Sequence, residues 1–373
     1  MRFLFVSAGT AGHINPALSI AGELRSIVPD AEFLFVGAGR EMERKLIPRE
    51  GFELVNLRVT GLARGFSGKD IRHNIETLNN LVNANRDAAK VIDSFRPDCV
   101  IGTGGYVCYP VIRAACKRGI PTVLHESNAE PGMANRLLSG MVTKMLVAYP
   151  KVEKRYRRPD RVVYTGTPIK GDFEDITSAE AKKRLGLDPE RPLLVSFWGS
   201  LGAALMNDRM ADVIAKNEKS GAFFHIHATG GGDAGLTKMR ERLRTRGITE
   251  LRHTDLRPYI NDMGLVMTAG DLIISRAGGS TLAEITNTGT ASILVPSPNV
   301  TANQQEKNAL ELEKNGAAIM IREEEATGER LFASASGLLL DKKRLASISK
   351  NAKKLGRTDA REKIAEIVLD LVK

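Results

Sequence analysis

Residues 272–308 combine glycine turns with polar side chains that could bind a ligand. Their order predicts a strand, a glycine turn, a helix, a second strand and a polar loop. The turn at residues 278–281 would leave free backbone N–H groups at the start of the helix, where they and the helix dipole attract a phosphate. Glu284 could hold a ribose diol, and the amide-rich loop at residues 303–308 could bind hydroxyls. Diphosphate, ribose and hydroxyl groups together indicate a sugar nucleotide.

The same residues allow a purely structural interpretation. Thr281 and Glu284 have the spacing of a capping box, in which the glutamate carboxylate returns to the first N–H groups of its own helix. Glycine turns before helices are also ordinary in α/β proteins. The sequence of this stretch leaves both interpretations open.

His13 is a candidate general base, because it ends a glycine turn that follows a predicted strand. Four such turns occur in the chain, at residues 9–12, 102–105, 199–202 and 277–280. A histidine placed there can accelerate a reaction by about 10²–10⁴-fold, although a lone histidine is more often structural. Residues 125–128 follow another strand, and they either bind substrate or start a helix.

The chain offers no obvious metal site. It has no Asp-x-Asp pair and no histidine–carboxylate cluster with metal-ligand spacing. We therefore expect no metal and no cofactor, and we expect helix dipoles and cations to stabilise a leaving phosphate.

Apolar runs alternate with helical patterns nearly throughout, which predicts an α/β protein with parallel sheets covered on both faces. The predicted strands are residues 3–7, 33–36, 99–101, 122–125 and 144–147, then, after a basic and irregular segment to about residue 175, residues 193–197, 223–227, 272–274 and 292–295. We expect two Rossmann-like domains, residues 1–165 and 166–359, facing a cleft, with ligands beyond the carboxyl ends of the strands. Residues 360–373 have helical periodicity and are expected to pack back on the first domain.

The net charge of +10 is concentrated in residues 1–165. Basic residues cluster at 58–72 and 151–161, and residues 62–82 add an apolar stripe at helical spacing. Such a face could meet anionic lipid, nucleic acid or an acidic substrate, or it is solvated surface over a core-facing helix. Three cysteines without metal-like spacing indicate a reducing compartment. No apolar run approaches the roughly 18 residues that cross a bilayer, so we expect a cytoplasmic protein.

The joint order of the motifs resembles the MurG family, bacterial peptidoglycan glycosyltransferases of the GT-B fold, along nearly the whole chain. The motifs are Gly9-Thr-Ala-Gly-His13, Gly102-Thr-Gly-Gly-Tyr106, His125-Glu-Ser-Asn128, Gly166-Thr-Pro168, Gly199-Ser-Leu-Gly-Ala203, Arg276-Ala-Gly-Gly-Ser-Thr-Leu-Ala-Glu284 and Gln304-Gln305-x-x-Asn308. Several of these motifs are weak singly, but their shared order and spacing are specific.

The resemblance implies an inverting enzyme that moves N-acetylglucosamine from UDP-GlcNAc to the C4 hydroxyl of lipid I, which gives lipid II. Residues 1–165 would hold the acceptor and face the membrane, and residues 166–359 would hold the donor. The protein would be peripheral, at the cytoplasmic face of the cell membrane. Its partners would be the anionic inner-membrane surface and cell-wall synthesis proteins, and no nucleic acid.

The resemblance also assigns roles by motif position. His13 would be the base, Ile260 would meet uracil through its backbone, and Glu284 would hold the ribose. The diphosphate would meet Ser200, Lys170 and the turn formed by Gly279, Ser280 and Thr281. Thr10, Ala11, Gly12 and Asn128 would line the donor site from the N-terminal half, and Gln304, with Gln305 and Asn308, would bind the sugar. The other predicted substrate contacts are Leu282 and Ala283.

Some positions depart from the usual family pattern. Ala11 replaces a glycine, and Lys170 replaces an arginine, which keeps the charge but loses the planar fork of donors. Thr167 stands for asparagine, and Trp198 and Leu201 stand where glycine and glutamine are common. Alternative functions are another lipid-directed GT-B enzyme such as a diacylglycerol glycosyltransferase, a basic nucleic-acid-binding protein, and a UDP-sugar epimerase.

Overall fold

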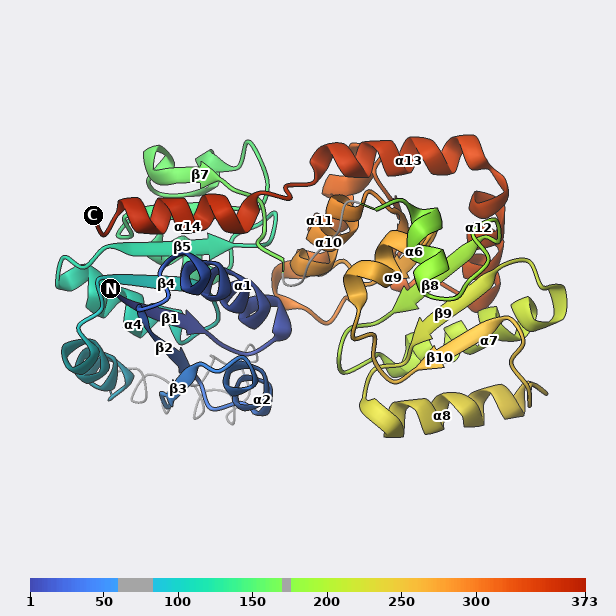
Figure 1. Cartoon of the computed structure of the whole chain (residues 1–373), viewed down its shortest axis with the longest axis horizontal. Helices are drawn as coiled ribbons and strands as arrows, with labels where there is room; N and C mark the ends of the chain where they lie inside the picture. The colour runs from blue at the N-terminus through green and yellow to red at the C-terminus, as the bar shows by residue number, and fades with distance from the viewer. Residues whose placement is uncertain (60–82, 170–175) are drawn as a thin grey trace. The chain divides into compact units, whose positions relative to one another are not determined.

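The computed structural model describes residues 1–59, 83–169 and 176–373 and divides the chain into two compact units (Figure 1). One unit comprises Met1–Lys170 and Thr358–Lys373, and the other comprises Gly171–Arg357. Each unit is built on a parallel sheet with helices packed against it. The predicted α/β fold with two parallel-sheet domains is confirmed.

The sheet of the N-terminal unit has the strand order β3-β2-β1-β4-β5-β6-β7, and its neighbouring strands are parallel. Its strands are β1 (Arg2–Ser7), β2 (Glu32–Gly37), β3 (Glu53–Asn56), β4 (Cys99–Gly104), β5 (Thr122–Glu126), β6 (Lys144–Val147) and β7 (Val162–Tyr164). The strand order reverses direction between β1 and β4. Ligands of doubly wound sheets bind beyond the carboxyl ends of the strands at such a point.

Helices cover the two faces of this sheet because successive side chains of a strand point to opposite faces. The helices are α1 (Ala11–Ile27), α2 (Glu41–Arg49), residues 83–95, α4 (Cys108–Lys117), α5 (Met133–Leu138) and α14 (Ala360–Asp370). Phe3 and Phe5 of β1 pack in a cluster with α1, α2 and α14. Leu4 and Val6 pack in another cluster with α4, α5 and the helix at residues 83–95. The C-terminal helix α14 thus contributes to the core of the N-terminal unit (Figure 1).

The C-terminal unit has a second parallel sheet, of order β10-β9-β8-β11-β12-β13. Its strands are β8 (Leu193–Phe197), β9 (Phe224–Ala228), β10 (Thr254–Arg257), β11 (Leu272–Ser275), β12 (Ala291–Leu294) and β13 (Ile319–Met320). Here the order reverses between β8 and β11. The turns that follow these two strands are therefore neighbours at the carboxyl edge of the sheet.

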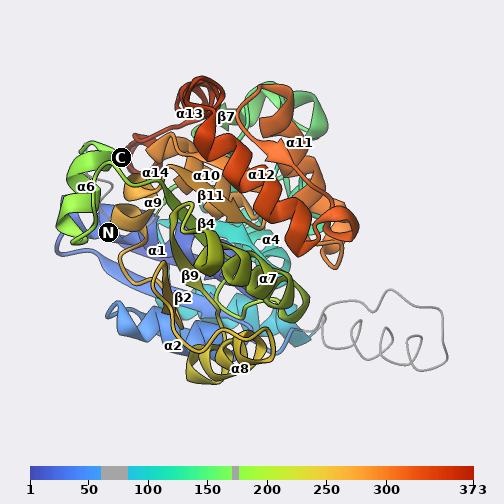
Figure 2. The same cartoon turned by 90° about the vertical axis from the view of Figure 1, so that its right-hand side faces the viewer.

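The helices of this unit are α6 (Ser178–Arg184), α7 (Ala204–Ser220), α8 (Gly232–Thr245), α9 (Met263–Ala269), α10 (Gly279–Thr288), α11 (Gln304–Lys314), α12 (Gly328–Leu340) and α13 (Lys342–Leu355). Helices α7 and α12 pack together over one face of the sheet, as Figure 2 shows from their side. Trp198, at the end of β8, is buried in the core beneath them.

The structure differs from the sequence prediction in several places. Strands β3, β7, β10 and β13 were not predicted, because they are short and carry polar or mixed side chains. The segment before residue 175 that the sequence suggested to be irregular contains β7, which pairs with β6 and so belongs to the first sheet. Helix α1 begins at Ala11, directly after the first glycine turn, so Pro16 lies inside the helix.

Candidate active site

The first turn of α10 in the C-terminal unit presents unused hydrogen-bond donors. The first intrahelical bond of α10 runs from the N–H of Leu282 to the carbonyl of Gly278, so the N–H groups of Gly279, Ser280 and Thr281 have no helical acceptor. The hydroxyl oxygen of Ser280 is buried and finds no partner among the described residues. An orphaned hydroxyl beside free N–H groups at a helix start is suited to bind an anion.

Glu284 does not form the capping box that its spacing with Thr281 allowed. Helix α10 begins at Gly279 with Gly278 as N-cap, and no side chain caps it. Among the described residues, none forms an ion pair or a hydrogen bond with the Glu284 carboxylate. Burial raises the pKa of this carboxyl group to about 7. A partly buried carboxylate without a protein donor is ready to accept hydrogen bonds from a ligand.

The prediction of a polar loop at residues 303–308 is wrong, because this stretch starts a helix. Asn303 is the N-cap of α11, and Gln304 is its first residue. Gln305 accepts the N–H of Ser297 at 2.8 Å, and the buried side chain of Asn308 donates to the carbonyl of Ala277 at 3.2 Å. Both side chains thus stabilise neighbouring loops. The Gln304 side chain forms no hydrogen bond with the described residues.

The bend before α11 is strained. Ala302 and Asn303 both adopt left-handed backbone conformations, with φ of 52° and 53°. A non-glycine residue in this region is disfavoured by roughly 1–2 kcal/mol. The bend directs the chain so that α11 begins directly at Gln304.

Ser200 lies in an exposed turn that a second glycine turn supports. The carbonyl of Ser200 accepts the N–H of Gly231 at 3.0 Å. Residues 230–232 are three successive glycines with positive φ, and a Cβ on Gly202 would lie 2.4 Å from the carbonyl oxygen of Thr229. The sequence prediction did not single out residues 230–232, although three consecutive glycines after a strand were visible in it.

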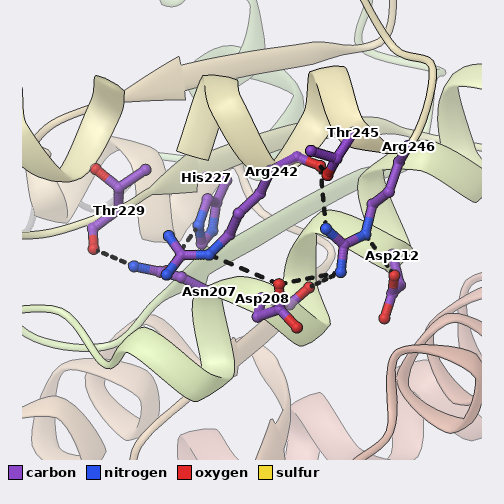
Figure 3. A network of polar contacts seen from close by, with 8 residues as sticks. All are labelled: Asn207, Asp208, Asp212, His227, Thr229, Arg242, Thr245 and Arg246. Atoms are coloured by element: carbon purple, nitrogen blue, oxygen red, sulfur yellow. Dashed lines mark hydrogen bonds and ion pairs between the residues drawn. The ribbon is translucent and has the colours of Figure 1, made fainter. Parts of the chain in front are cut away.

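A buried polar network underlies these two turns (Figure 3). The side-chain amide of Asn207 donates to the carbonyl of Thr229 at 2.8 Å, and its oxygen accepts from Nε2 of His227 at 3.2 Å. Ser196 bonds to Nδ1 of His227 at 2.7 Å. Burial lowers the pKa of His227 to about 3, so the ring stays neutral and its two nitrogens keep these partners.

Next to this network, ion pairs connect α7 with the end of α8 (Figure 3). The Arg246 guanidinium contacts Asp208 at 3.0 Å and Asp212 at 2.6 Å, and Arg242 lies 3.7 Å from Asp208. Pairs as exposed as these contribute roughly 0–1 kcal/mol each. They connect the C-terminal end of α8 to α7.

Arg276 begins one of the sequence motifs, but the motif alone does not indicate what its side chain does. Its guanidinium donates to the carbonyls of Val295 and Pro296 at 3.1 and 3.2 Å and pairs with Glu323. It also lies 5.8 Å from the Trp198 ring centroid. Arg276 therefore joins the loops that follow β8, β11 and β12.

The other predicted donor residues occupy less open positions. Ile260 follows β10 and is almost fully buried, which leaves its backbone as the group that could meet a base. Leu282 is buried, and its N–H and carbonyl are both used within α10. Ala283 lies partly exposed in the same helix. Lys170 lies outside the described residues.

In the N-terminal unit, the turn after β4 holds the His13 ring. Nδ1 of His13 lies 3.0 Å from the carbonyl oxygen of Thr103, and the Thr103 hydroxyl donates to the His13 carbonyl at 2.7 Å. Because a carbonyl only accepts, Nδ1 carries the proton, and Nε2 is the basic nitrogen of the neutral ring. A Cβ on Gly104 would lie 2.4 Å from Nδ1. This glycine turn therefore accommodates an imidazole.

The predicted contacts beside His13 begin the same helix. Thr10 is the exposed N-cap of α1, and Ala11 and Gly12 are its first two residues. The carbonyl of Thr10 accepts the N–H of His13 at 3.0 Å. Their free N–H groups lie at the start of a 17-residue helix at the carboxyl edge of the sheet.

The cluster at residues 125–128 is organised by Glu126. This buried carboxylate accepts from the N–H and side-chain amide of Asn128, the N–H of Gly132 and the side chain of Asn135, all within 3.0 Å. His125 bonds to the carbonyl of Gly166 at 2.8 Å. Burial lowers the pKa of His125 to about 4. The cluster shapes the loop that presents Asn128.

Much of the basic cluster at residues 151–161 is committed to the protein's own surface. Arg155 pairs with Glu130 at 3.1 Å, and Arg158 pairs with Asp160 at 2.7 Å. Arg161 donates to the carbonyl of Val142 at 2.7 Å. The other predicted basic cluster and the apolar stripe, within residues 58–82, lie almost wholly outside the described residues.

Within residues 1–59, 83–169 and 176–373, no group of three or more His, Cys, Asp or Glu side chains is arranged to hold a metal ion. No helix in these ranges is long and apolar enough to cross a membrane.

Comparison with known proteins finds matches to both units and along the full length of the chain. Residues 3–147 match the glycosyltransferase family 28 N-terminal domain, and residues 193–364 match its C-terminal domain. A curated protein of Acetivibrio thermocellus is 40% identical over 100% of this chain and 99% of its own length. One of Listeria welshimeri is 36% identical over 100% of both chains. Each is named "UDP-N-acetylglucosamine--N-acetylmuramyl-(pentapeptide) pyrophosphoryl-undecaprenol N-acetylglucosamine transferase".

Solved structures share the fold. The crystal structure of Acinetobacter baumannii MurG has a TM-score of 0.75 and 24% identity, and the match covers 99% of each chain. A UDP-GlcNAc 2-epimerase of Neisseria meningitidis, bound to UDP-GlcNAc, has a TM-score of 0.66 and 15% identity, covering 99% of this chain and 100% of its own. The fold and the two domain matches are those of a glycosyltransferase of family 28. The chain belongs to the MurG enzymes of that family.

Proposed function

We propose that this enzyme transfers N-acetylglucosamine from UDP-GlcNAc to the C4 hydroxyl of lipid I, with inversion at the anomeric carbon. The names of full-length relatives at 36–40% identity support the reaction. The observation that carries the donor assignment is the start of α10, where the buried Ser280 hydroxyl has no described partner and the neighbouring N–H groups are free. These donors would meet the diphosphate, and Glu284 would accept the ribose hydroxyls.

The proposed chemistry is a single displacement. Nε2 of His13 takes the proton of the acceptor hydroxyl, whose oxygen bonds to the anomeric carbon as the bond to the UDP oxygen breaks. The negative charge that develops on the diphosphate is stabilised by the dipole and N–H groups of α10. Gln304, at the start of α11, would read the sugar hydroxyls.

The test is release of UDP from UDP-GlcNAc, measured with and without a lipid I analogue and in excess EDTA. We expect release that depends on the acceptor and is unchanged by the chelator. Consumption of UDP-GlcNAc without acceptor would favour an epimerase. Equal turnover with diacylglycerol would favour a broader lipid glycosyltransferase, and loss of activity in EDTA would overturn stabilisation by the helix alone.

We also propose that the N-terminal unit rests on an anionic membrane surface at the cytoplasmic face, as a peripheral protein. Met133, Leu137 and Met141 are exposed by 70%, 43% and 41%, on α5 and just after it. Exposed Arg136 lies on the same helix, and the Arg157 side chain packs beside Gly140. Apolar side chains with a basic rim suit an interface with anionic lipid.

Replacing Met133 and Leu137 together by serine should weaken binding to vesicles that contain anionic lipid. We expect about 30-fold weaker partition, because each of the two inserted side chains contributes roughly 1 kcal/mol. Sedimentation with vesicles measures the partition, and turnover of a water-soluble acceptor analogue should stay unchanged. Leu340→Ser, at an 83% exposed leucine of the C-terminal unit, is the control. Equal partition of both variants would place the lipid contact elsewhere.

A further inference from the structure

Glu43, on α2 of the N-terminal unit, is a fully buried carboxylate to which neither the sequence motifs nor the proposed reaction gives a role. Its oxygens accept three backbone N–H groups, from Gly9 at 2.8 Å, Ala38 at 2.8 Å and Arg40 at 3.1 Å. All three partners are donors, so the geometry suits the ionised group. A buried charge is tolerated when it is hydrogen-bonded in this way.

Two of these three bonds are local and the third is not. The N–H groups of Ala38 and Arg40 belong to the loop that leads into α2, where a carboxylate in the first helical turn ordinarily bonds. The bond to Gly9 reaches 34 residues back, to the turn after β1. A Cβ on Gly37 would lie 2.6 Å from Oε2 of Glu43, so the glycine leaves the space that this carboxylate fills. The capping of α2 does not require the bond to Gly9.

The bond to Gly9 fixes the chain just before His13. Ala8 donates its N–H to the carbonyl of Gly104 at 3.3 Å, so the turn after β4 holds this segment from the other side. Gly9 has a φ of +100°, which only glycine adopts readily. The next residue, Thr10, accepts the N–H of His13 with its carbonyl. Hydrogen bonds to Glu43 and to Gly104, the last residue of β4, thus hold the segment that leads into α1.

We propose that Glu43 is a positioning residue for His13: through the Gly9 N–H, it sets the start of α1 and thereby the direction of Nε2. The inference rests on the proposed role of His13 as the base. It predicts that disturbing Glu43 slows the proton-transfer step and leaves the donor contacts at the start of α10, in the other unit, unaffected.

Glu43→Gln tests this at nearly constant shape, because an amide has only one acceptor oxygen and its NH₂ group would face N–H donors. We expect kcat to fall by about 10- to 100-fold, the loss that a misplacement near 1 Å produces, with a smaller change in KM for UDP-GlcNAc, because most of its predicted contacts belong to the other unit. Gly37→Ala, which crowds Oε2 and keeps the charge, should reproduce a kcat loss. It also serves if Glu43→Gln does not fold.

Glu218→Gln is the matched control. The Glu218 carboxylate likewise accepts backbone N–H groups, from Arg252 at 2.8 Å and His253 at 3.1 Å, just before β10. Glu218 itself lies near the C-terminal end of α7, in the other unit. This variant should lose stability and keep kcat. If the Glu43 and Glu218 variants show the same kcat at temperatures where both are folded, Glu43 is only structural.

A double-mutant cycle separates this inference from the role of His13 itself. In a His13→Ala background, Glu43→Gln should lower the residual kcat by less than about twofold, because residues that act as a unit are not additive. A full further loss would show that Glu43 acts by another route. Full turnover in His13→Ala alone would instead refute the base assignment.

Discussion

His13→Ala is expected to lower kcat by about 10²–10⁴-fold, the usual contribution of a general base. The Thr103 carbonyl holds Nδ1 at 3.0 Å, which leaves Nε2 as the basic atom of the neutral ring. Without it, the acceptor hydroxyl must lose its proton to water. KM for UDP-GlcNAc should hardly change, because the predicted donor contacts that begin α10 belong to the other unit. Steady-state UDP release with a lipid I analogue measures both constants.

The stabilisation of the variant by UDP provides the control for this prediction. UDP should raise the melting temperature of His13→Ala as much as that of the unaltered enzyme, since ligand binding stabilises the folded state in proportion to its affinity. An unchanged kcat would remove His13 from the mechanism. A lost UDP effect, with lowered kcat, would mean that the substitution disturbs the protein more widely than the base alone.

Local patterns predicted the elements that lie along one stretch of chain. The apolar runs at Phe3–Ser7 and Leu193–Phe197 became the central strands β1 and β8, because strands buried on both faces read as continuous hydrophobic segments. The glycine turn at residues 277–280 begins α10 as expected, since the signal for the turn and for the helix is contiguous. Such features depend on near neighbours only.

Contacts between distant residues were beyond the sequence patterns. The bond from Gly9 to Glu43 spans 34 residues, and the ion pair of Arg276 with Glu323 spans 47. No periodicity connects these positions. Gly9 and Glu43 meet because β1 and β2, which precede them, are neighbours, while Arg276 and Glu323 follow β11 and β13, which lie on either side of β12. The prediction for residues 303–308 failed for a different reason. Their amide side chains favoured a loop, while the leucine and glutamate residues that follow extend a helix back to Gln304.

The binding of UDP-GlcNAc should depend on pH through Glu284. Burial raises the pKa of this carboxyl group to about 7 in the free protein. The ribose hydroxyls would donate to the ionised form, so binding favours loss of the proton, and affinity rises with pH until the group is ionised. We expect about tenfold tighter binding at pH 8 than at pH 6, and no further gain above that. Calorimetric titration with UDP-GlcNAc is suitable, because its diphosphate charge is constant in this range.

Glu284→Ala should weaken UDP-GlcNAc binding by about 100-fold at pH 8, because hydrogen bonds to a charged group contribute roughly 1.5–3 kcal/mol. Glu284→Gln, which keeps an acceptor oxygen, should bind more tightly than the alanine variant and lose the pH dependence. Glu241→Gln, on the exposed face of α8, should change neither property. If the Glu284 variants melt at lower temperature but keep both the affinity and its pH slope, the carboxylate only stabilises α10. Since no described residue satisfies that carboxylate, we expect the ligand to supply its hydrogen bonds.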